Sequence, residues 1–131
     1  MSGAENTVTD SPKVLIVDDE RLVRWSLAEA FRSAGFTVLE AQDVQSGMDC
    51  LAAGAGLDAA LLDCRLPDAD GLVLCDAIHR AWPACVCVMM TAFRTANLEP
   101  EAHRFGARRV IDKPFDVDDV VRSVRDALIR R

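Results

Sequence analysis

Three aspartates, a threonine and a lysine stand at the ends of short apolar runs in the sequence: Asp18, Asp19, Asp63, Thr91 and Lys113. A single aspartate in such a place is usually a helix cap or a turn residue. Four runs that all end in such polar side chains are difficult to explain by capping alone. Clustered carboxylates repel one another unless a cation lies among them. Oxygen ligands favour Mg²⁺ or Mn²⁺ over softer metals, so the pattern indicates a divalent-cation site.

A magnesium ion held by few carboxylates keeps coordination positions open for water and phosphate oxygens. Such a site favours phosphoryl chemistry, in which positioning and charge neutralisation supply most of the catalysis. The other metal-ligating side chains offer no comparable site. His79 and His103 fall in helical segments, and the 5 cysteines include no Cys-x-x-Cys pair. We interpret these thiols as reduced and mostly buried.

The apolar runs lack polar alternation, which is typical of strands buried on both faces of a parallel sheet. Amphipathic segments with apolar residues at helical spacing separate them. Strand–helix alternation with short loops predicts a doubly wound α/β sandwich, whose strands all end at one edge. The functional crevice of such a sheet lies at that edge. The predicted strands are 14–17, 36–39, 59–62, 86–90 and 109–111, and the predicted helices are 20–34, 43–54, 71–81, 99–105 and one that begins after the cap Asp116.

The fourth helical segment is less regular than the others because it contains Pro100. Proline is tolerated at the start of a helix but not in its interior. The position of this proline predicts a late helix start near Glu99, preceded by an irregular segment over 94–98.

Length and composition limit the class of protein. A chain of 131 residues, half of them apolar, predicts one packed domain over 13–131 behind a flexible polar tail over 1–12. The net charge of −6 argues against direct binding of nucleic acid by this segment. No apolar run is long enough for a membrane span, and the polar start lacks the features of a secretion signal. These features predict a cytoplasmic protein that does not bind membranes.

Four runs of the sequence resemble the receiver domain of bacterial two-component response regulators, in the order and spacing of that family. The resemblance extends over roughly 12–131 and implies a flavodoxin-like (βα)5 sandwich with a five-stranded parallel sheet in the order 2-1-3-4-5. It also implies a phosphoacceptor switch that assists its own phosphorylation and dephosphorylation, and not an enzyme with a separate substrate. The matching runs are VLIVDDE at 14–20, LLDCRLPDADGL at 61–72, MMTAF at 89–93 and DKPF at 112–115.

The resemblance implies a role for each polar residue at the strand ends. Asp63 corresponds to the aspartate that receives a phosphoryl group from a sensor histidine kinase or a histidine phosphotransferase. Asp18 and Asp19, together with Asp63, correspond to the magnesium site, to which Arg65 lends its backbone carbonyl. Thr91 corresponds to the hydroxyl that binds the phosphoryl group. Lys113 corresponds to the lysine that pairs first with Asp63 and then with a phosphoryl oxygen. Pro114 corresponds to a proline that follows a cis peptide bond, and Gly71 to the glycine of the loop after the phosphorylation strand.

One position departs from the family pattern. Val110 stands where the family has an aromatic switch residue, three positions before the lysine. Two interpretations remain open: activation uses the Thr91 loop alone, or Phe93 and the segment 94–98 take over the coupling. Arg65 and Phe93 match positions that tune loss of the phosphoryl group in the family. The family often dimerises through its fourth helix, fifth strand and fifth helix, a surface that Pro100 alters here.

The face of the first helix directed away from the core carries Leu22 and Trp25, which are candidates for contact with the partner kinase. The run DDERLVRWSL at 18–27 also resembles receivers of enhancer-binding activators that work with an alternative sigma factor. The predicted output is therefore transcription, through a domain absent from this sequence. Inert packing of these two side chains is the alternative interpretation.

Three other classes fit less well. A magnesium-dependent phosphatase would show a second aspartate two residues after its nucleophile, where this chain has Arg65. A flavin-binding protein would need a phosphate loop after the first strand, and the acids there would repel phosphate. A stand-alone or degenerate receiver that only binds a partner stays open because of Val110.

Overall fold

The structure, a computed structural model, describes residues 11–54 and 56–130. Strands and helices alternate along these residues, and the strands form a five-stranded parallel sheet in the order β2-β1-β3-β4-β5. The predicted doubly wound fold and its strand order are confirmed. No helix in this part of the chain has the length and apolar character that a membrane span requires. In chain order the elements are β1 (Lys13–Val17), α2 (Arg21–Ser33), β2 (Thr37–Ala41), α3 (Val44–Ala52), β3 (Ala59–Asp63), α4 (Gly71–Ala81), β4 (Val86–Thr91), α5 (Leu98–Arg104), β5 (Ala107–Asp112) and α6 (Val117–Arg130).

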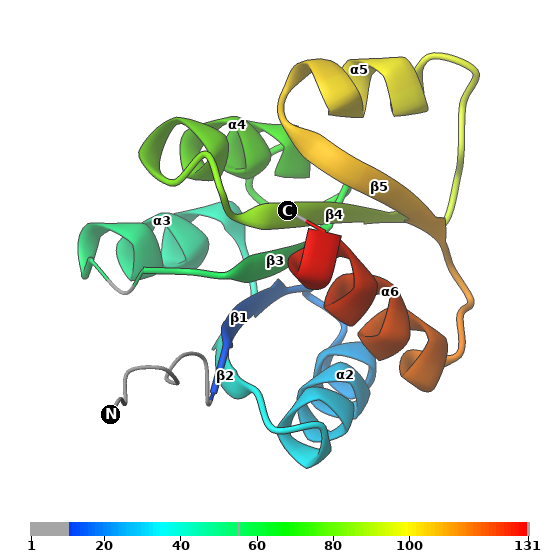
Figure 1. Ribbon diagram of the computed structural model, residues 1–131. Coiled ribbons are helices and arrows are strands. Elements are labelled where there is room, and N and C mark those ends of the chain that lie inside the picture. Colours follow the sequence, from blue (N-terminus) through cyan, green and yellow to red (C-terminus); the bar gives the residue numbers. More distant parts are fainter. Residues whose placement is uncertain (1–10, 55, 131) are drawn as a thin grey trace.

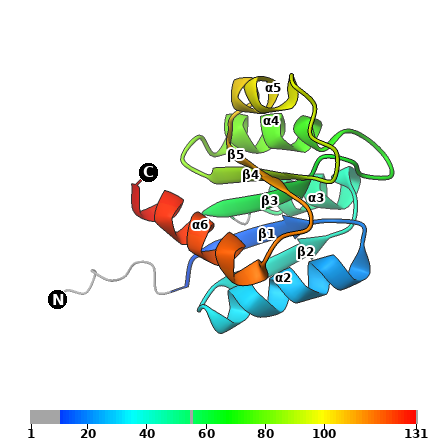
Figure 2. The same ribbon diagram turned by 90° about the vertical axis from the view of Figure 1, so that its right-hand side faces the viewer.

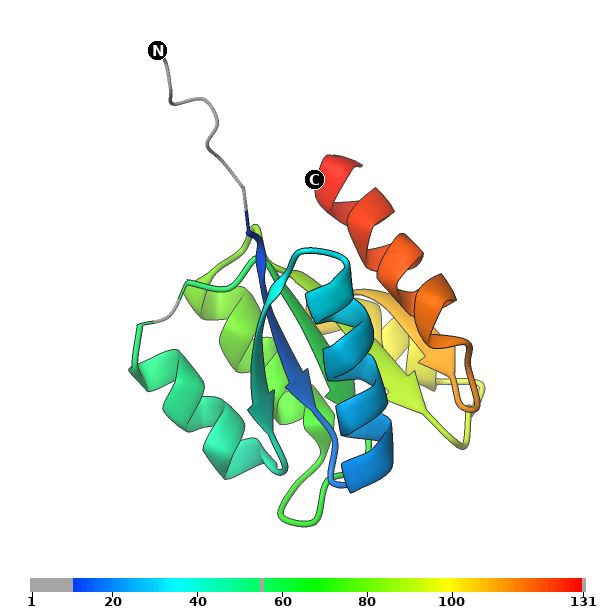
Figure 3. The same cartoon turned by 90° about the horizontal axis from the view of Figure 1, so that it is seen from below.

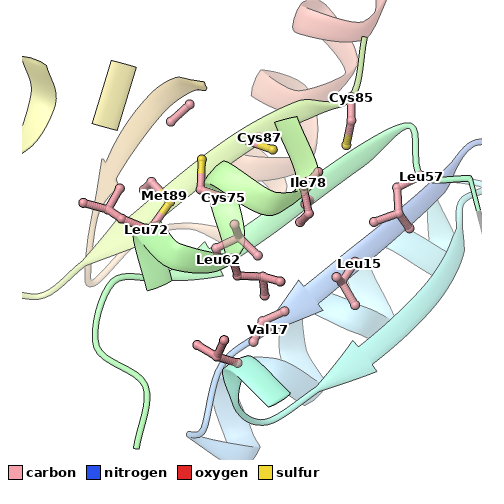
Figure 4. Close-up of a cluster of buried hydrophobic side chains, with 14 of the residues drawn as sticks. Leu15, Val17, Leu57, Leu62, Leu72, Cys75, Ile78, Cys85, Cys87 and Met89 are labelled. Atoms are coloured by element: carbon pink, nitrogen blue, oxygen red, sulfur yellow. The ribbon is translucent and has the colours of Figure 1, made fainter. Parts of the chain in front are cut away.

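Helices cover both faces of the sheet, α2 and α6 on one side and α3, α4 and α5 on the other (Figures 1 and 2). Side chains that alternate along each central strand therefore enter two different apolar layers. In β1, Val14 and Ile16 pack toward α2 and α6, whereas Leu15 and Val17 pack toward α3 and α4. Figure 4 shows part of the second layer. Because β1, β3 and β4 are buried on both faces, their sequences are continuous apolar runs.

The two edge strands differ from their predicted bounds. β2 begins and ends later than the run 36–39, and β5 extends beyond the run 109–111 at both ends. Edge strands expose one side to water and so accept polar residues, which an apolar pattern does not detect. Arg108 and Arg109 are exposed in β5, next to a register shift opposite Cys87 and Val88.

Helix α5 begins at Leu98, one residue before the predicted start, and Pro100 is its third residue. The first four N–H groups of a helix have no acceptor within the helix, so proline costs little there. The irregular segment before α5 is present, as predicted.

Most of the predicted N-terminal tail, 1–12, lies outside the described residues. Its last two residues are joined to the fold. The Ser11 hydroxyl lies 2.6 Å from the Thr37 hydroxyl, and the Pro12 carbonyl accepts a hydrogen bond from the Thr37 N–H. Among the described residues, contacts with the domain thus begin at Ser11, two residues before the predicted domain start at residue 13.

Asp68 joins the loop after β3 to the start of α3. Its two carboxylate oxygens accept hydrogen bonds from the Val44 and Gln45 N–H groups, each at 2.9 Å. These N–H groups belong to the first turn of α3, where the helix dipole favours a negative charge. The Asp43 side chain completes the cap by accepting from the Ser46 N–H.

Replacing Asp68 by asparagine is expected to destabilise the protein at neutral pH and to have no effect at low pH. Hydrogen bonds from Val44 and Gln45 lower the pKa of Asp68. A carboxylate with a lower pKa in the folded than in the unfolded protein adds stability above its unfolded-state pKa. This stability is lost as the pH falls through the folded-state pKa. Thermal unfolding of wild type and Asp68→Asn across pH checks this prediction. A difference in unfolding temperature that persists at low pH would contradict it.

Candidate functional site

The polar residues at the strand ends converge on one edge of the sheet. Asp18 follows β1, Asp63 ends β3, Thr91 ends β4, and Lys113 follows β5. The parallel strands carry these ends to the same side, opposite the start of β1 and the end of α6 (Figure 3). Sheet register places Asp63 beside Met90 and Thr91 beside Asp112. The parallel strands therefore bring these side chains together although they come from distant parts of the sequence.

Three carboxylates form a compact cluster at this edge. Asp18, Asp19 and Asp63 each offer an oxygen that lies within 4.8 Å of the others. Asp18 is fully buried, Asp63 is 6% exposed, and Asp19 is exposed at the mouth of the site. The donors are all oxygen, and two of them are shielded from water. This arrangement fits the preferences of Mg²⁺ and Mn²⁺.

The Lys113 ammonium lies among the acids. Its Nζ is 2.8 Å from Asp18 Oδ2, 3.2 Å from Asp63 Oδ2 and 3.1 Å from Glu20 Oε1. Burial alone would lower the pKa of Lys113, but the hydrogen bond and charge of Asp18, together with the charge of Asp63, raise it above its ordinary value. The lysine is therefore charged throughout the physiological range and offsets part of the acid repulsion.

Burial raises the pKa of Asp63 above its ordinary value, and the charge of Asp18 acts in the same direction. The Arg65 N–H, which donates to Asp63 Oδ1 at 3.1 Å, and the Lys113 ammonium oppose this shift. Two partly desolvated carboxylates side by side favour a bound cation, because a cation removes their mutual repulsion. The Arg65 carbonyl as a further metal ligand stays a prediction.

Thr91 is buried, and its hydroxyl oxygen accepts a hydrogen bond from the Phe93 N–H at 3.0 Å. Its carbonyl accepts from the Lys113 N–H at 2.8 Å. The backbone of the Thr91 loop is thus joined directly to the loop after β5. The next peptide bond, Lys113–Pro114, is cis.

Gly71 fits closely behind the Asp63 carbonyl. A Cβ added to Gly71 would lie 2.0 Å from the Asp63 carbonyl oxygen and 3.3 Å from Cys64 Cα. The Gly71 N–H also donates to the Cys64 carbonyl at 2.9 Å. No side chain fits at residue 71 unless the backbone next to Asp63 moves.

Gly71→Ala is accordingly expected to destabilise the protein by about 2–3 kcal/mol, because the added methyl group overpacks against backbone. Gly47→Ala is the matched control, since its Cβ would meet only the end of the Leu74 side chain, at 2.5 Å. Alanine also favours a helix by about 1 kcal/mol relative to glycine. Urea unfolding of both variants checks the prediction, and an equal loss of stability in the two would contradict it.

The predicted partner residues on α2 are exposed, Leu22 by 69% and Trp25 by 60%. Leu22 lines a groove of about 540 Å³ beside Lys113, whereas Trp25 does not line it. The other lining residues come from α2 and the residue before it, the Thr91 loop, the loop after β5 and the start of α6. They are Glu20, Val23, Ser26, Ala92, Lys113, Pro114, Phe115 and Val117.

The remaining predicted switch residues lie around the mouth of the site. Val110 is half-buried and packs against the α3–α4 layer. Phe93 is 67% exposed, and the Arg65 guanidinium carbon lies 5.3 Å from the centre of its ring. This contact joins the loop after β3 to the loop after β4.

The cysteines are structural. Cys75, Cys85 and Cys87 are buried together between α4 and β4, where Figure 4 shows their side chains in one apolar layer. Neighbouring thiols and burial raise the pKa of Cys75, and burial raises the pKa of Cys64 to about 11. These groups are therefore neutral thiols in the physiological range and poor nucleophiles.

Sequence reasoning gave no role to Glu20 or Arg24. Glu20 pairs with Lys113, and Arg24 Nη1 donates to the Asp18 carbonyl at 2.6 Å. Their proximity to Asp18 in the sequence is the one signal that could have identified them. Long charged side chains reach several partners, so that signal alone does not select one.

A doubly wound sheet with an acid cluster and a largely buried lysine side chain at its carboxyl edge defines the class of protein: an α/β domain with an acidic pocket at that edge. A family model of the response regulator receiver domain matches residues 14–125. The chain therefore belongs to the response regulator receiver domain family.

Similar proteins agree with this assignment. The DNA-binding transcriptional regulator NtrC of Escherichia coli strain K12 is 33% identical over 115 residues, which cover 88% of this chain and 24% of NtrC. A CheY-like receiver domain protein from Methanospirillum hungatei JF-1 superposes with a TM-score of 0.86 at 24% identity, covering 92% of this chain and 95% of that one. The BeF3-activated DrrB receiver domain has a TM-score of 0.81 at 21% identity and covers 92% and 99%. These two structures support the fold. The chain spans about a quarter of the length of NtrC.

Proposed function

We propose that this receiver domain is a phosphoacceptor switch in which the Asp63 carboxylate takes a phosphoryl group from a phosphohistidine of a partner kinase or phosphotransferase. One observation carries the proposal: three carboxylates converge within 4.8 Å, with the Lys113 ammonium against two of them. Together with the family assignment, this geometry favours phosphoryl transfer over a purely structural acid cluster.

The proposed reaction is a single displacement at phosphorus. An Asp63 oxygen attacks the phosphorus, the phosphorus–nitrogen bond breaks, and the imidazole nitrogen of the donor leaves with the electron pair. Asp18, Asp19 and Asp63 would hold Mg²⁺, which neutralises charge on the phosphoryl oxygens when bound. Lys113 pairs with Asp63 before the reaction and with a phosphoryl oxygen after it.

The acyl phosphate adds negative charge and acceptor oxygens at the mouth of the sheet. The Thr91 hydroxyl donates to one of these oxygens, and its loop moves with it. Because the Lys113 N–H binds the Thr91 carbonyl, this movement reaches β5 directly. Through these contacts phosphorylation changes the surface formed by α5, β5 and α6.

The proposed partners follow from that surface and from α2. Leu22, with the groove beside Lys113, forms an exposed apolar area where the helices of a kinase would dock. Trp25 adds exposed apolar area on the same helix. The α5–β5–α6 surface is the proposed dimer interface. The NtrC relatives are transcriptional regulators, which supports transcription as the output, through a domain outside this sequence, and the cytoplasm as the site of action.

The proposed function is tested by incubating the protein with acetyl phosphate and Mg²⁺. Intact-protein mass spectrometry should detect the gain of one phosphoryl group. The gain should disappear on brief alkaline treatment, as an acyl phosphate requires, and should be absent in EDTA. An unmodified protein under these conditions would favour a receiver that only binds partners.

The contact between Arg65 and Phe93 is expected to slow loss of the phosphoryl group, because it ties the loop after Asp63 to the loop after Thr91 and so would limit the access of water between them. An exposed cation–π contact contributes about 0.5–1 kcal/mol. Arg65→Ala and Phe93→Ala should therefore each shorten the lifetime of the phosphorylated protein about two- to five-fold, with no further loss in the double variant. Phosphate release after removal of the donor measures the lifetime. Additive effects of the two substitutions would exclude a joint action.

A further inference from the structure

Arg94 joins three parts of the chain beside the proposed phosphoryl site. Its Nε lies 2.9 Å from Asp112 Oδ1, and its Nη1 lies 3.2 Å from Glu99 Oε1. Its Nη2 donates to the Val110 carbonyl at 2.9 Å. The guanidinium thereby ties the loop 92–97 to the end of β5 and to the first turn of α5. We call these four residues the Arg94 clamp.

The clamp lies next to the groups that would bind a phosphoryl group. Arg94 is three residues after Thr91, and Asp112 directly precedes Lys113. A movement of the Thr91 loop that carries Arg94 with it would therefore break the Arg94 contacts or move the end of β5. Residues 92–97 are exposed, and a segment with little burial changes conformation at low cost unless side chains hold it.

The charges of the clamp favour a fixed arrangement. The guanidinium pairs with two carboxylates and also donates a hydrogen bond to a carbonyl of the edge strand β5. The hydrogen bond and charge of Asp112 raise the pKa of Arg94 further. The Arg94 side chain is 33% exposed, and its partners Asp112 and Glu99 are 62% and 54% exposed, so solvent and salt partly screen both ion pairs.

We propose that the Arg94 clamp is a latch that stabilises the resting position of the Thr91 loop and so opposes phosphoryl binding at Asp63. This inference rests on the proposed function. Contacts made only in the resting state lower the population of the binding-competent state, and the apparent affinity falls by the same factor. For two partly exposed ion pairs and one hydrogen bond, that factor is about two- to ten-fold.

The latch is tested by calorimetric titration with beryllofluoride, a phosphoryl mimic, at saturating Mg²⁺. Arg94→Met and Asp112→Asn should each bind beryllofluoride about two- to ten-fold more tightly than wild type. The two substitutions change the net charge in opposite directions. An effect of charge through space would therefore shift the two affinities in opposite directions, whereas a broken latch shifts both in the same direction. The double variant should bind no more tightly than the tighter single variant.

Arg80→Met is the matched control, because Arg80 pairs with Asp76 at 3.1 Å on α4 and is 78% exposed. Its affinity should equal that of wild type, and thermal unfolding should show that all the variants are folded. The latch would be overturned if the clamp variants bound beryllofluoride with unchanged or weaker affinity, or if their affinities shifted in opposite directions. These results would leave the proposed function intact. Failure of the wild type itself to bind beryllofluoride would overturn the proposed function and the latch together.

Discussion

Asp63→Asn is expected to abolish phosphoryl incorporation from acetyl phosphate. Asparagine has nearly the same shape, but its neutral amide is not a nucleophile for phosphorus and forms no acyl phosphate. Loss of a nucleophile lowers the rate by far more than loss of a positioning contact, so the rate should fall at least about a hundred-fold. Mass spectrometry of wild type and variant at matched times measures the difference.

Asp126→Asn provides the control for this comparison. It makes the same chemical change on the exposed face of α6, outside the acid cluster. This variant should be phosphorylated at the wild-type rate. Undiminished labelling of Asp63→Asn would place the modification on another residue, and loss of labelling in Asp126→Asn would show that the assay reports on charge alone.

Lys113→Met is expected to reduce the free energy of unfolding by about 3 kcal/mol in the absence of divalent cations. The Lys113 side chain is only 12% exposed, and its ammonium is the cation between Asp18 and Asp63. Without it, two adjacent buried carboxylates lose their counter-charge. Millimolar Mg²⁺ should restore part of the stability, because an ion that binds only the folded protein stabilises it. Urea unfolding with EDTA and with Mg²⁺ measures both effects.

The double variant Asp18→Asn with Lys113→Met separates charge from packing. Removing one acid should recover part of the stability lost in Lys113→Met, because the repulsion with Asp63 is gone. If the loss is due to packing of the lysine stem, the double variant will be no more stable than the single one. An unfolding free energy of Lys113→Met equal to that of wild type would contradict the proposed electrostatic role.

The central strands could be predicted because burial on both faces leaves a strong apolar pattern. The runs that became β1, β3 and β4 lie where the sequence predicts them, within one residue at each end. The edge strand β5 was predicted too short at both ends because Arg108 and Asp112 are exposed polar residues that interrupt the apolar pattern. Periodicity alone did not give the strand order, which came from the resemblance to receiver domains.

The carboxylate cluster was predictable for a different reason. Parallel strands fix where their last residues lie, so Asp18, Asp63 and Lys113 needed only the correct strands to converge. Contacts of long side chains were not predictable in this way. The Arg94 contact with Asp112 joins residues 18 positions apart, and its partner depends on the path of an exposed loop.

A crystal structure of the protein with Mn²⁺ and beryllofluoride tests the proposed phosphoryl site most directly. The anomalous signal of the metal should lie among Asp18, Asp19 and Asp63, with carboxylate oxygens at about 2.1 Å. The beryllofluoride group should be joined to an Asp63 oxygen, within hydrogen-bonding distance of Lys113 Nζ and the Thr91 hydroxyl. A metal bound elsewhere, or an Asp63 carboxylate that carries no beryllofluoride at saturating concentration, would contradict the proposal.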